Sequence, residues 1–120
     1  MRNRVSVKTG ITLLAAMFVN AAIAAEPAKE ETGKELAYNN KQGNCLACHA
    51  MPTMPDAVQP GNSGPPLVAM SARFPDKAAL RAQIYDPMVH NPNTIMPPIG
   101  KNKILTEKQL DKVVDFIYGL

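Results

Sequence analysis

The sequence predicts an all-α domain in which three main helices are joined by proline-rich loops. Two segments, beginning at Thr32 and Thr106, have the spacing of a capping box, in which a threonine and the Glu or Gln three positions later cap each other's backbone N–H groups. No segment shows the alternation of apolar and polar residues that is typical of a half-buried strand. Of the 11 prolines, five lie in residues 50–66 and four in residues 86–100, so we expect these segments to be loops.

The first helix is predicted to begin at Thr32, whose capping-box partner is Glu35, and to run toward Gln42. Gly43 and Asn44 are expected to end it. After the first loop, the pattern predicts a short helical piece within residues 67–72.

A longer helix is predicted over residues 76–85, where Leu80 and Ile84 lie four positions apart on one face. The last helix is predicted to begin at Thr106, and Leu105 and Leu110 have the spacing of a hydrophobic staple around its start. Its expected inner face is Leu110, Val113, Val114 and Ile117, with Tyr118 alongside.

The first 24 residues have the pattern of a secretory signal peptide. Three basic residues within the first eight positions precede an apolar stretch over residues 11–23, and an A-x-A site ends at Ala24. This stretch is too short for a membrane span. We therefore expect cleavage after Ala24, with the next alanine as the rival position, and export to the periplasm. A flexible leader over residues 25–31 and one domain over residues 32–120 should follow.

Charge and composition exclude several classes of partner. The formal net charge is +3, but the three basic residues of the signal peptide account for it, because 13 − 3 = 10 Lys and Arg then face 10 Asp and Glu. We therefore expect no nucleic-acid binding, and no membrane span in the mature chain. The remaining 120 − 24 = 96 residues contain no Trp, so the chain alone would bury only a thin core.

The segment Cys45-Leu46-Ala47-Cys48-His49 uses both cysteines of the chain and has the attachment pattern of a c-type haem. Two thiols three positions apart can each add to one vinyl group of the porphyrin, and His49 then lies under the iron as its proximal ligand. We therefore expect one covalent haem c, which would also supply apolar mass to the thin core.

Three other uses of these residues are less favoured. A thioredoxin-like dithiol should lie near a βαβ pattern, which the flanking sequence lacks. A zinc site would need four ligands, and Cys45, Cys48, His49 and His90 are the only Cys and His residues in the chain. A disulfide across so short a loop would remove little closure entropy and would stabilise little.

The second axial ligand is predicted to be Met96, which lies in a loop stiffened by Pro97 and Pro98 between two helices. His90 is the runner-up. Met51 and Met54 follow the proximal histidine too closely to reach the opposite face of the haem. Met70 and Met88 lie beside apolar helical segments, where methionine usually packs.

A metal-bound imidazole usually donates its other N–H to a carbonyl or a carboxylate. The stiff turn Gly64-Pro65-Pro66-Leu67 offers such an acceptor in the carbonyl of Pro65, although an ordinary proline-rich turn would have the same sequence. The loop of Met96, followed by Lys101 and Lys103, is predicted to form a docking surface together with the insert over residues 51–64. The alternatives are an ordinary surface loop for the insert and solvated surface charge for the two lysines.

These features resemble a class I cytochrome c and, more narrowly, the SoxX family, the monohaem cytochrome subunits of the thiosulfate-oxidising SoxAX complex. The resemblance covers residues 43–120, which is 78 residues. The segments that carry it are Gly43 to His49, Gly64 to Val68, Arg73 to Pro75, Leu80 to Asp86 and Asn91 to Pro98.

The resemblance implies a class I cytochrome c-like domain in which three main helices surround the haem and His49 and Met96 are the axial ligands. It also implies a heterodimer with a SoxA-like haem protein that carries the sulfur chemistry. That complex, an L-cysteine S-thiosulfotransferase, joins thiosulfate oxidatively to a cysteine of the SoxYZ carrier, and electrons leave to a downstream acceptor cytochrome. By itself the chain would be an electron carrier. Two alternatives stay open: a freely diffusing monohaem cytochrome that shuttles electrons to an oxidase, and a five-coordinate haem that binds small ligands.

Overall fold

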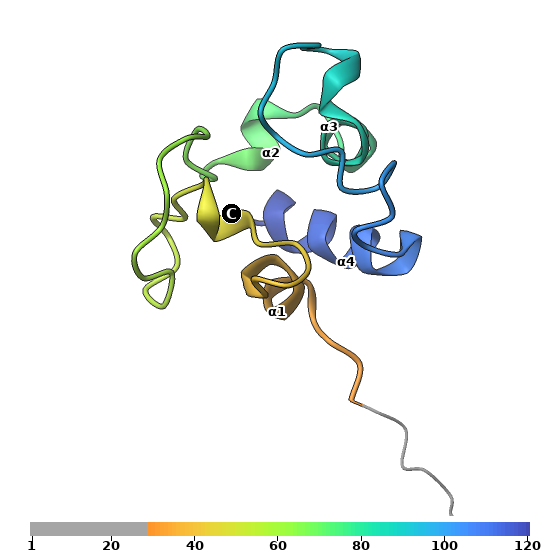
Figure 1. Cartoon of the computed structure of the whole chain (residues 1–120). Coiled ribbons are helices and arrows are strands. Elements are labelled where there is room, and N and C mark those ends of the chain that lie inside the picture. Colours follow the sequence, from red (N-terminus) through yellow and green to blue (C-terminus); the bar gives the residue numbers. More distant parts are fainter. Residues whose placement is uncertain (1–28) are drawn as a thin grey trace, which may run out of the picture.

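The computed structural model describes residues 29–120, and within them the chain forms helices and loops without a strand (Figure 1). The predicted all-α fold is therefore confirmed. The predicted signal peptide, residues 1–24, and the first part of the predicted leader, residues 25–28, lie outside the described residues. The elements in chain order are α1 (Gly33–Tyr38), the 3₁₀ turn η1 (Cys45–Ala47), α2 (Met70–Arg73), α3 (Lys77–Tyr85), the 3₁₀ turn η2 (Pro87–Val89) and α4 (Glu107–Tyr118).

Both predicted capping boxes are present. At the start of α1, the Thr32 hydroxyl accepts a hydrogen bond from the Glu35 N–H at 3.2 Å, and the Glu35 carboxylate accepts one from the Thr32 N–H at 2.7 Å. At the start of α4, the Thr106 hydroxyl and the Gln109 side-chain oxygen make the same exchange at 3.3 and 2.9 Å. Each box satisfies two backbone donors near the helix start, which is why both helices begin at the predicted residues.

The first helix is shorter than predicted, because it ends at Tyr38 instead of running toward Gln42. Asn39 leaves the helical conformation, and its side chain accepts a hydrogen bond from the Lys41 N–H at 2.9 Å and donates one to the Gln42 side chain at 3.2 Å. Asparagine competes with a helix in this way because its short polar side chain bonds to nearby backbone groups. The residues after Tyr38 therefore form a turn that leads into the Cys45 segment.

The short helix lies later than predicted, at residues 70–73 instead of 67–72. Ala69 adopts a left-handed conformation with φ of 50° directly before it, so the chain turns sharply into the helix there. Leu67 is not helical, and its N–H donates to the Ala50 carbonyl at 2.8 Å. The predicted start was wrong because Ala69 adopts the left-handed conformation, so residues 67–69 cannot belong to the same right-handed helix as Met70.

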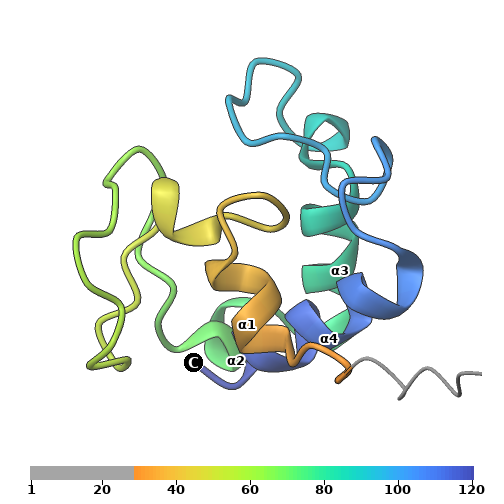
Figure 2. The ribbon, with the colours of Figure 1, turned by 60° about the horizontal axis from the view of Figure 1, so that its bottom comes forward.

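The first and last helices of the described chain cross in close contact, as both views of the ribbon show (Figures 1 and 2). At Gly33 the backbones approach so closely that a Cβ would lie 2.0 Å from the Lys112 carbonyl oxygen. The rings of Tyr38 and Phe116 meet edge to face with centroids 6.3 Å apart. The predicted inner face of α4 is buried in the core at Leu110, Val113, Val114 and Ile117.

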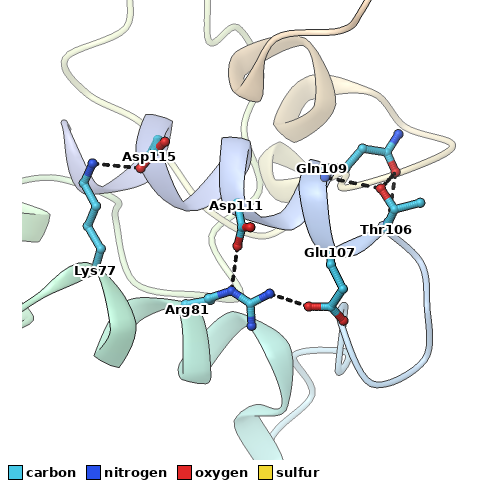
Figure 3. A network of polar contacts seen from close by, with 7 residues as sticks. All are labelled: Lys77, Arg81, Thr106, Glu107, Gln109, Asp111 and Asp115. Atoms are coloured by element: carbon cyan, nitrogen blue, oxygen red, sulfur yellow. Dashed lines mark hydrogen bonds and ion pairs between the residues drawn. The ribbon is translucent and has the colours of Figure 1, made fainter.

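The helices α3 and α4 are joined on their exposed side by a row of ion pairs (Figure 3). Lys77 pairs with Asp115 at 2.8 Å, and Arg81 pairs with Asp111 at 2.7 Å and also with Glu107. Exposed pairs of this kind typically contribute about 0–1 kcal/mol each, so they align the helices more than they stabilise them. Burial of apolar side chains between the helices supplies the larger stabilisation, and Leu80 and Ile84 of α3 are both buried as predicted.

Residues 29–31, the described part of the predicted leader, lie against α4. Glu30 pairs with Lys108 at 2.7 Å and with Lys112 at 3.1 Å, and these two lysines lower the pKa of its carboxyl. Lys112 also donates a hydrogen bond to the carbonyl of Glu31 at 2.8 Å. Among the helices of residues 29–120, none has the length and apolar character required to cross a membrane.

Candidate functional site

A cavity of about 520 Å³ lies between the Cys45 segment and the loop before α4. All five residues proposed from the sequence line it, namely Cys45, Cys48, His49, Pro65 and Met96. The helices contribute an apolar wall of Met70, Phe74, Leu80, Ile84, Val113 and Ile117. Its volume and its mostly apolar lining with a few polar groups are typical of sites for small molecules and cofactors.

Two loops from different parts of the chain contribute to the lining of the cavity. The loop after α1, brown to yellow in Figure 2, contributes residues 40–44, and the loop after η2, cyan to blue, contributes residues 94–97. The short first helix matters here, because its early end at Tyr38 leaves residues 40–44 in a turn that lines the cavity.

A tight turn places the two cysteines and the histidine on the cavity. Asn44 adopts the left-handed conformation with φ of 50°, which asparagine tolerates better than most residues. The carbonyl of Cys45 then accepts hydrogen bonds from the N–H groups of Cys48 at 3.2 Å and His49 at 2.9 Å. The turn therefore brings both half-buried thiols and the imidazole to one wall. The part played by Asn44 was missed in the sequence, although the residue type is a signal for this conformation.

The two thiols are free, and burial raises the pKa of Cys45 to about 11. Its sulfur is therefore a neutral thiol at physiological pH.

The imidazole of His49 is oriented by the proline-rich turn. Its Nδ1 lies 2.7 Å from the carbonyl oxygen of Pro65. A carbonyl oxygen can only accept, so Nδ1 carries the proton and the lone pair remains on Nε2. This is the tautomer in which Nε2 is available to a metal, and the acceptor is the one proposed from the sequence.

Two glycines of the insert lie in contact with this turn. A Cβ on Gly64 would lie 2.3 Å from Cε1 of His49, and one on Gly61 would lie 1.9 Å from the carbonyl oxygen of Ala47. The N–H groups of the same glycines donate to the carbonyls of Cys48 and Leu46, each at 2.8 Å. Gly64 therefore packs directly on His49, the proposed proximal ligand. Its position before two prolines gave no signal for this contact.

The insert is attached to the molecule at several points. Met51 is 2% exposed and belongs to the core, and Met54 packs against the core from the outside. Asp56 forms an ion pair with Lys34 and accepts a hydrogen bond from the Tyr38 hydroxyl at 3.4 Å. The part of the insert that remains free for other contacts is its outer end, where Val58 is 71% exposed.

Met96 lies half-buried at the cavity, and its N–H donates to the Thr94 hydroxyl at 3.1 Å. Met70 also lines the cavity, but its sulfur accepts a hydrogen bond from Arg73 at 3.4 Å and it is buried in the core. Met88 does not line the cavity and is 44% exposed. Of these three sulfur atoms, Met96 therefore has the placement that suits a ligand.

His90, the alternative ligand in the sequence, is not brought to this cavity. It lines a separate groove on the outer side of α3, together with Arg81, Tyr85 and Val89. The two histidines of the chain therefore belong to different places, and His49 is the one that lies beside the cysteines.

Comparisons with known proteins agree with this arrangement. A family model described as "Cytochrome C oxidase, cbb3-type, subunit III" matches residues 28–117. Among solved structures, the crystal structure of SoxXA from P. pantotrophus is similar, with a TM-score of 0.64 and 27% sequence identity. That match covers 72% of this chain and 77% of the other. No curated protein matches the chain.

The family match extends over most of the described residues and includes every residue that lines the cavity. The predicted class I cytochrome c-like fold, the resemblance to SoxX and the predicted cofactor are confirmed by these two matches. The cavity fits the cofactor as well, because it places two thiols, a correctly protonated imidazole and a thioether on an apolar lining. The chain therefore belongs to the cytochrome family described as cytochrome c oxidase, cbb3-type, subunit III, and it carries a covalent haem c.

Proposed function

We propose that Cys45 and Cys48 hold the haem through thioether bonds and that His49 and Met96 bind its iron from opposite sides. The bound haem supplies a centre that takes up and releases one electron at a time. The residues around it hold the ligands in place and exclude water with an apolar wall. If His49 and Met96 both bind the iron, a substrate would have no free site on it, so the chain would carry electrons and leave bond formation to another protein.

The observation that supports this most directly is the contact between His49 and Pro65. The 2.7 Å hydrogen bond fixes the ring orientation and keeps the lone pair on Nε2. A histidine in a plain surface turn would not need such an acceptor, nor a glycine packed against its ring as Gly64 is. The same wall carries the two thiols, as attachment of a haem requires.

We further propose that the chain is the SoxX-like subunit of a periplasmic heterodimer with a SoxA-like haem protein. The complex would act as an L-cysteine S-thiosulfotransferase. In that reaction, the sulfane sulfur of thiosulfate bonds to a carrier cysteine, the thiol loses its proton, and two electrons leave. This chain would take the electrons one at a time and pass them to a downstream acceptor cytochrome. Its own cysteines are used for haem attachment, so the reacting thiol belongs to another chain.

The proposed contact with the partner lies at the loop that carries Met96, since a partner's haem must come close to the haem held in the cavity. Ile95, beside Met96, lines the cavity and is 78% exposed, so it offers an apolar side chain to a partner. Lys103, directly before Ile104 of the cavity lining, is exposed and forms no ion pair among residues 29–120. Lys101, which the sequence also placed on this surface, is instead paired with Asp86.

Co-purification tests this proposal. A tagged form of this chain, expressed with its candidate haem-bearing partner, should form a stable complex, and thiosulfate-dependent cytochrome reduction should need both proteins. Ile95→Asp should weaken the complex if the Met96 loop docks, and Val58→Asp should weaken it if the insert docks. Lys77→Gln is the control, because Lys77 lies at the start of α3 and pairs with Asp115 of α4. It should leave the complex intact. Full thiosulfate oxidation without this chain would contradict the proposal.

A second function, favoured by the family description, is a freely diffusing monohaem cytochrome that delivers electrons to an oxidase. It predicts a monomer in the presence of the candidate partner and rapid reduction of an oxidase by the purified chain. The visible absorption spectrum distinguishes a five-coordinate haem from both of these functions. An open iron site is high-spin and binds added carbon monoxide at once when reduced.

A further inference from the structure

The two ends of the loop that carries Met96 lie in contact, where Gly100 and Lys101 meet Tyr85 and Asp86. Lys101 donates its backbone N–H to the carbonyl of Tyr85 at 3.1 Å and its ammonium to the carboxylate of Asp86 at 2.7 Å. Gly100 packs on the ring of Tyr85 so closely that a Cβ would lie 2.1 Å from Cδ2. The chain therefore leaves the end of α3, passes over the cavity with Met96, and returns to the same point.

Asp86 is the one buried charged residue among residues 29–120, and its side chain is 10% exposed. One carboxylate oxygen accepts the hydrogen bond from Lys101, and the other accepts one from the Met88 N–H at 3.3 Å. A buried carboxylate is costly unless it is paired, so Asp86 needs Lys101 to be close. The pair therefore favours the conformation in which the two ends of the loop meet.

Between these ends, the loop has no polar attachment to the helices. The N–H of Met96 donates to Thr94, and the N–H groups of Asn93 and Thr94 bond to Asn91 within the same loop. Within the described chain, every hydrogen bond made by residues 88–98 stays inside residues 86–102. The position of Met96 over the cavity therefore depends on apolar contacts and on the closed base.

We infer that Asp86 and Lys101 form a clamp that holds the Met96 loop closed and thereby keeps the methionine sulfur on the iron against competing ligands. This inference rests on the proposed function, in which Met96 is the second axial ligand. The two residues are positioning residues, since neither lines the cavity. A loop with a weaker base spends more time open, and an external ligand that binds only the open form then gains apparent affinity in proportion.

Imidazole binding to the oxidised haem protein tests the clamp. In Asp86→Asn, the amide oxygen can still accept from the Met88 N–H, but the charge that holds Lys101 is lost. We expect its apparent imidazole affinity to rise about tenfold, since the lysine end of the pair is exposed and screened while the carboxylate is buried. Lys101→Gln should have an effect in the same direction. The double variant should resemble the single variants instead of adding their effects, because both changes break one interaction.

Asp115→Asn is the matched control, because it breaks another lysine–aspartate pair, that of Lys77 at 2.8 Å, away from the loop. It should leave the imidazole affinity unchanged, which shows that the loss of a lysine–aspartate pair elsewhere does not open the loop. Equal affinities in the wild type, Asp86→Asn and Lys101→Gln would overturn the clamp. If the wild-type protein lacks the sulfur-to-iron band near the red end of its oxidised spectrum, the ligand assignment itself fails. If the band is present and the affinities do not move, the clamp alone fails.

Discussion

The two sides of the cavity are built differently. On the His49 side, three backbone hydrogen bonds of 2.8 Å, donated by Gly61, Gly64 and Leu67, join the insert and the proline-rich turn after it to residues 46–50. On the Met96 side, the loop bonds within itself and meets the helices at its base. One proposed ligand is therefore fixed by the structure around it, and the other by the ends of its loop. A single change should seldom free His49, whereas Met96 should respond to changes some distance away.

The largest expected effect comes from removing the haem that both sides would enclose. In Cys45→Ala together with Cys48→Ala, the cavity of about 520 Å³ has no covalent occupant, and the apolar wall around it loses its contacts. So small a domain has roughly 5–15 kcal/mol of stability in total, so we expect no cooperative thermal transition by circular dichroism. Cys48→Ala alone keeps one thioether and should unfold cooperatively. A native-like transition in the double variant would refute the idea that the fold depends on its haem.

A pair of glycine variants compares the two sides directly. No described glycine has a positive φ, so Gly64→Ala and Gly100→Ala test packing alone. Gly64→Ala drives a methyl group into the ring of His49, which is held by Pro65 and would be held by the iron in the holoprotein, and should cost about 2–3 kcal/mol in the free energy of unfolding. Gly100→Ala meets the ring of Tyr85, which forms no side-chain hydrogen bond among residues 29–120 and can move, and should cost about 1 kcal/mol. Chemical denaturation of the two holoproteins gives both values, and the reverse order would contradict the comparison.

A smaller effect on stability but a clear effect on the spectrum is expected from Met96→Ala. The sulfur-to-iron band of the oxidised protein should disappear, while the helical fold remains because His49 and the thioethers still hold the haem. Met70→Leu should keep the band and cost less than about 1.5 kcal/mol, since it conserves volume in the core. Persistence of the band in Met96→Ala would move the assignment to Met70 or Met88.

The smallest effect is expected at the start of α1, far from either ligand. The backbone N–H of Thr32 lowers the pKa of Glu35 to about 2, with the Thr32 side chain and Lys29 adding to the shift. A carboxyl whose pKa is depressed by folding stabilises the fold above its ordinary pKa, near 4.5, and loses that contribution as the pH falls toward 2. Glu35→Gln keeps an acceptor but cannot titrate. The wild type should therefore lose stability relative to this variant over that range, and parallel pH profiles would argue against the cap.

The sequence predicted the features that depend on neighbouring residues. The capping boxes at Thr32 and Thr106 involve residues three positions apart, so their spacing sets the helix starts. The haem attachment turn is likewise local, and the proline-rich turn of residues 64–67 indicated that the Pro65 carbonyl could accept a hydrogen bond from His49. The end of the first helix was missed, because the side chain of Asn39 bonds to Lys41 and Gln42 in the turn that follows, although its backbone N–H still donates to Glu35 of the helix.

Features that join distant residues could not be read from spacing. Asp86 and Lys101 are separated by a loop, and nothing in either residue shows that the carboxylate is buried. Lys101 was accordingly placed on a docking surface, although its charge is paired with Asp86 of the same chain. Gly64 and His49 meet because the insert folds back over the Cys45 turn, and that return is set by packing and backbone pairing.

The contact between Gly33 and Lys112 has a consequence for the order in which the molecule is made. These residues are 112 − 33 = 79 positions apart, yet they lie at one crossing, and α4 supplies Val113 and Ile117 to the wall of the cavity. Until α4 packs against α1, this wall of the cavity is incomplete and the Cys45 segment lies on an open chain. We therefore expect the two thiols to be most accessible to haem before the last helix closes the domain.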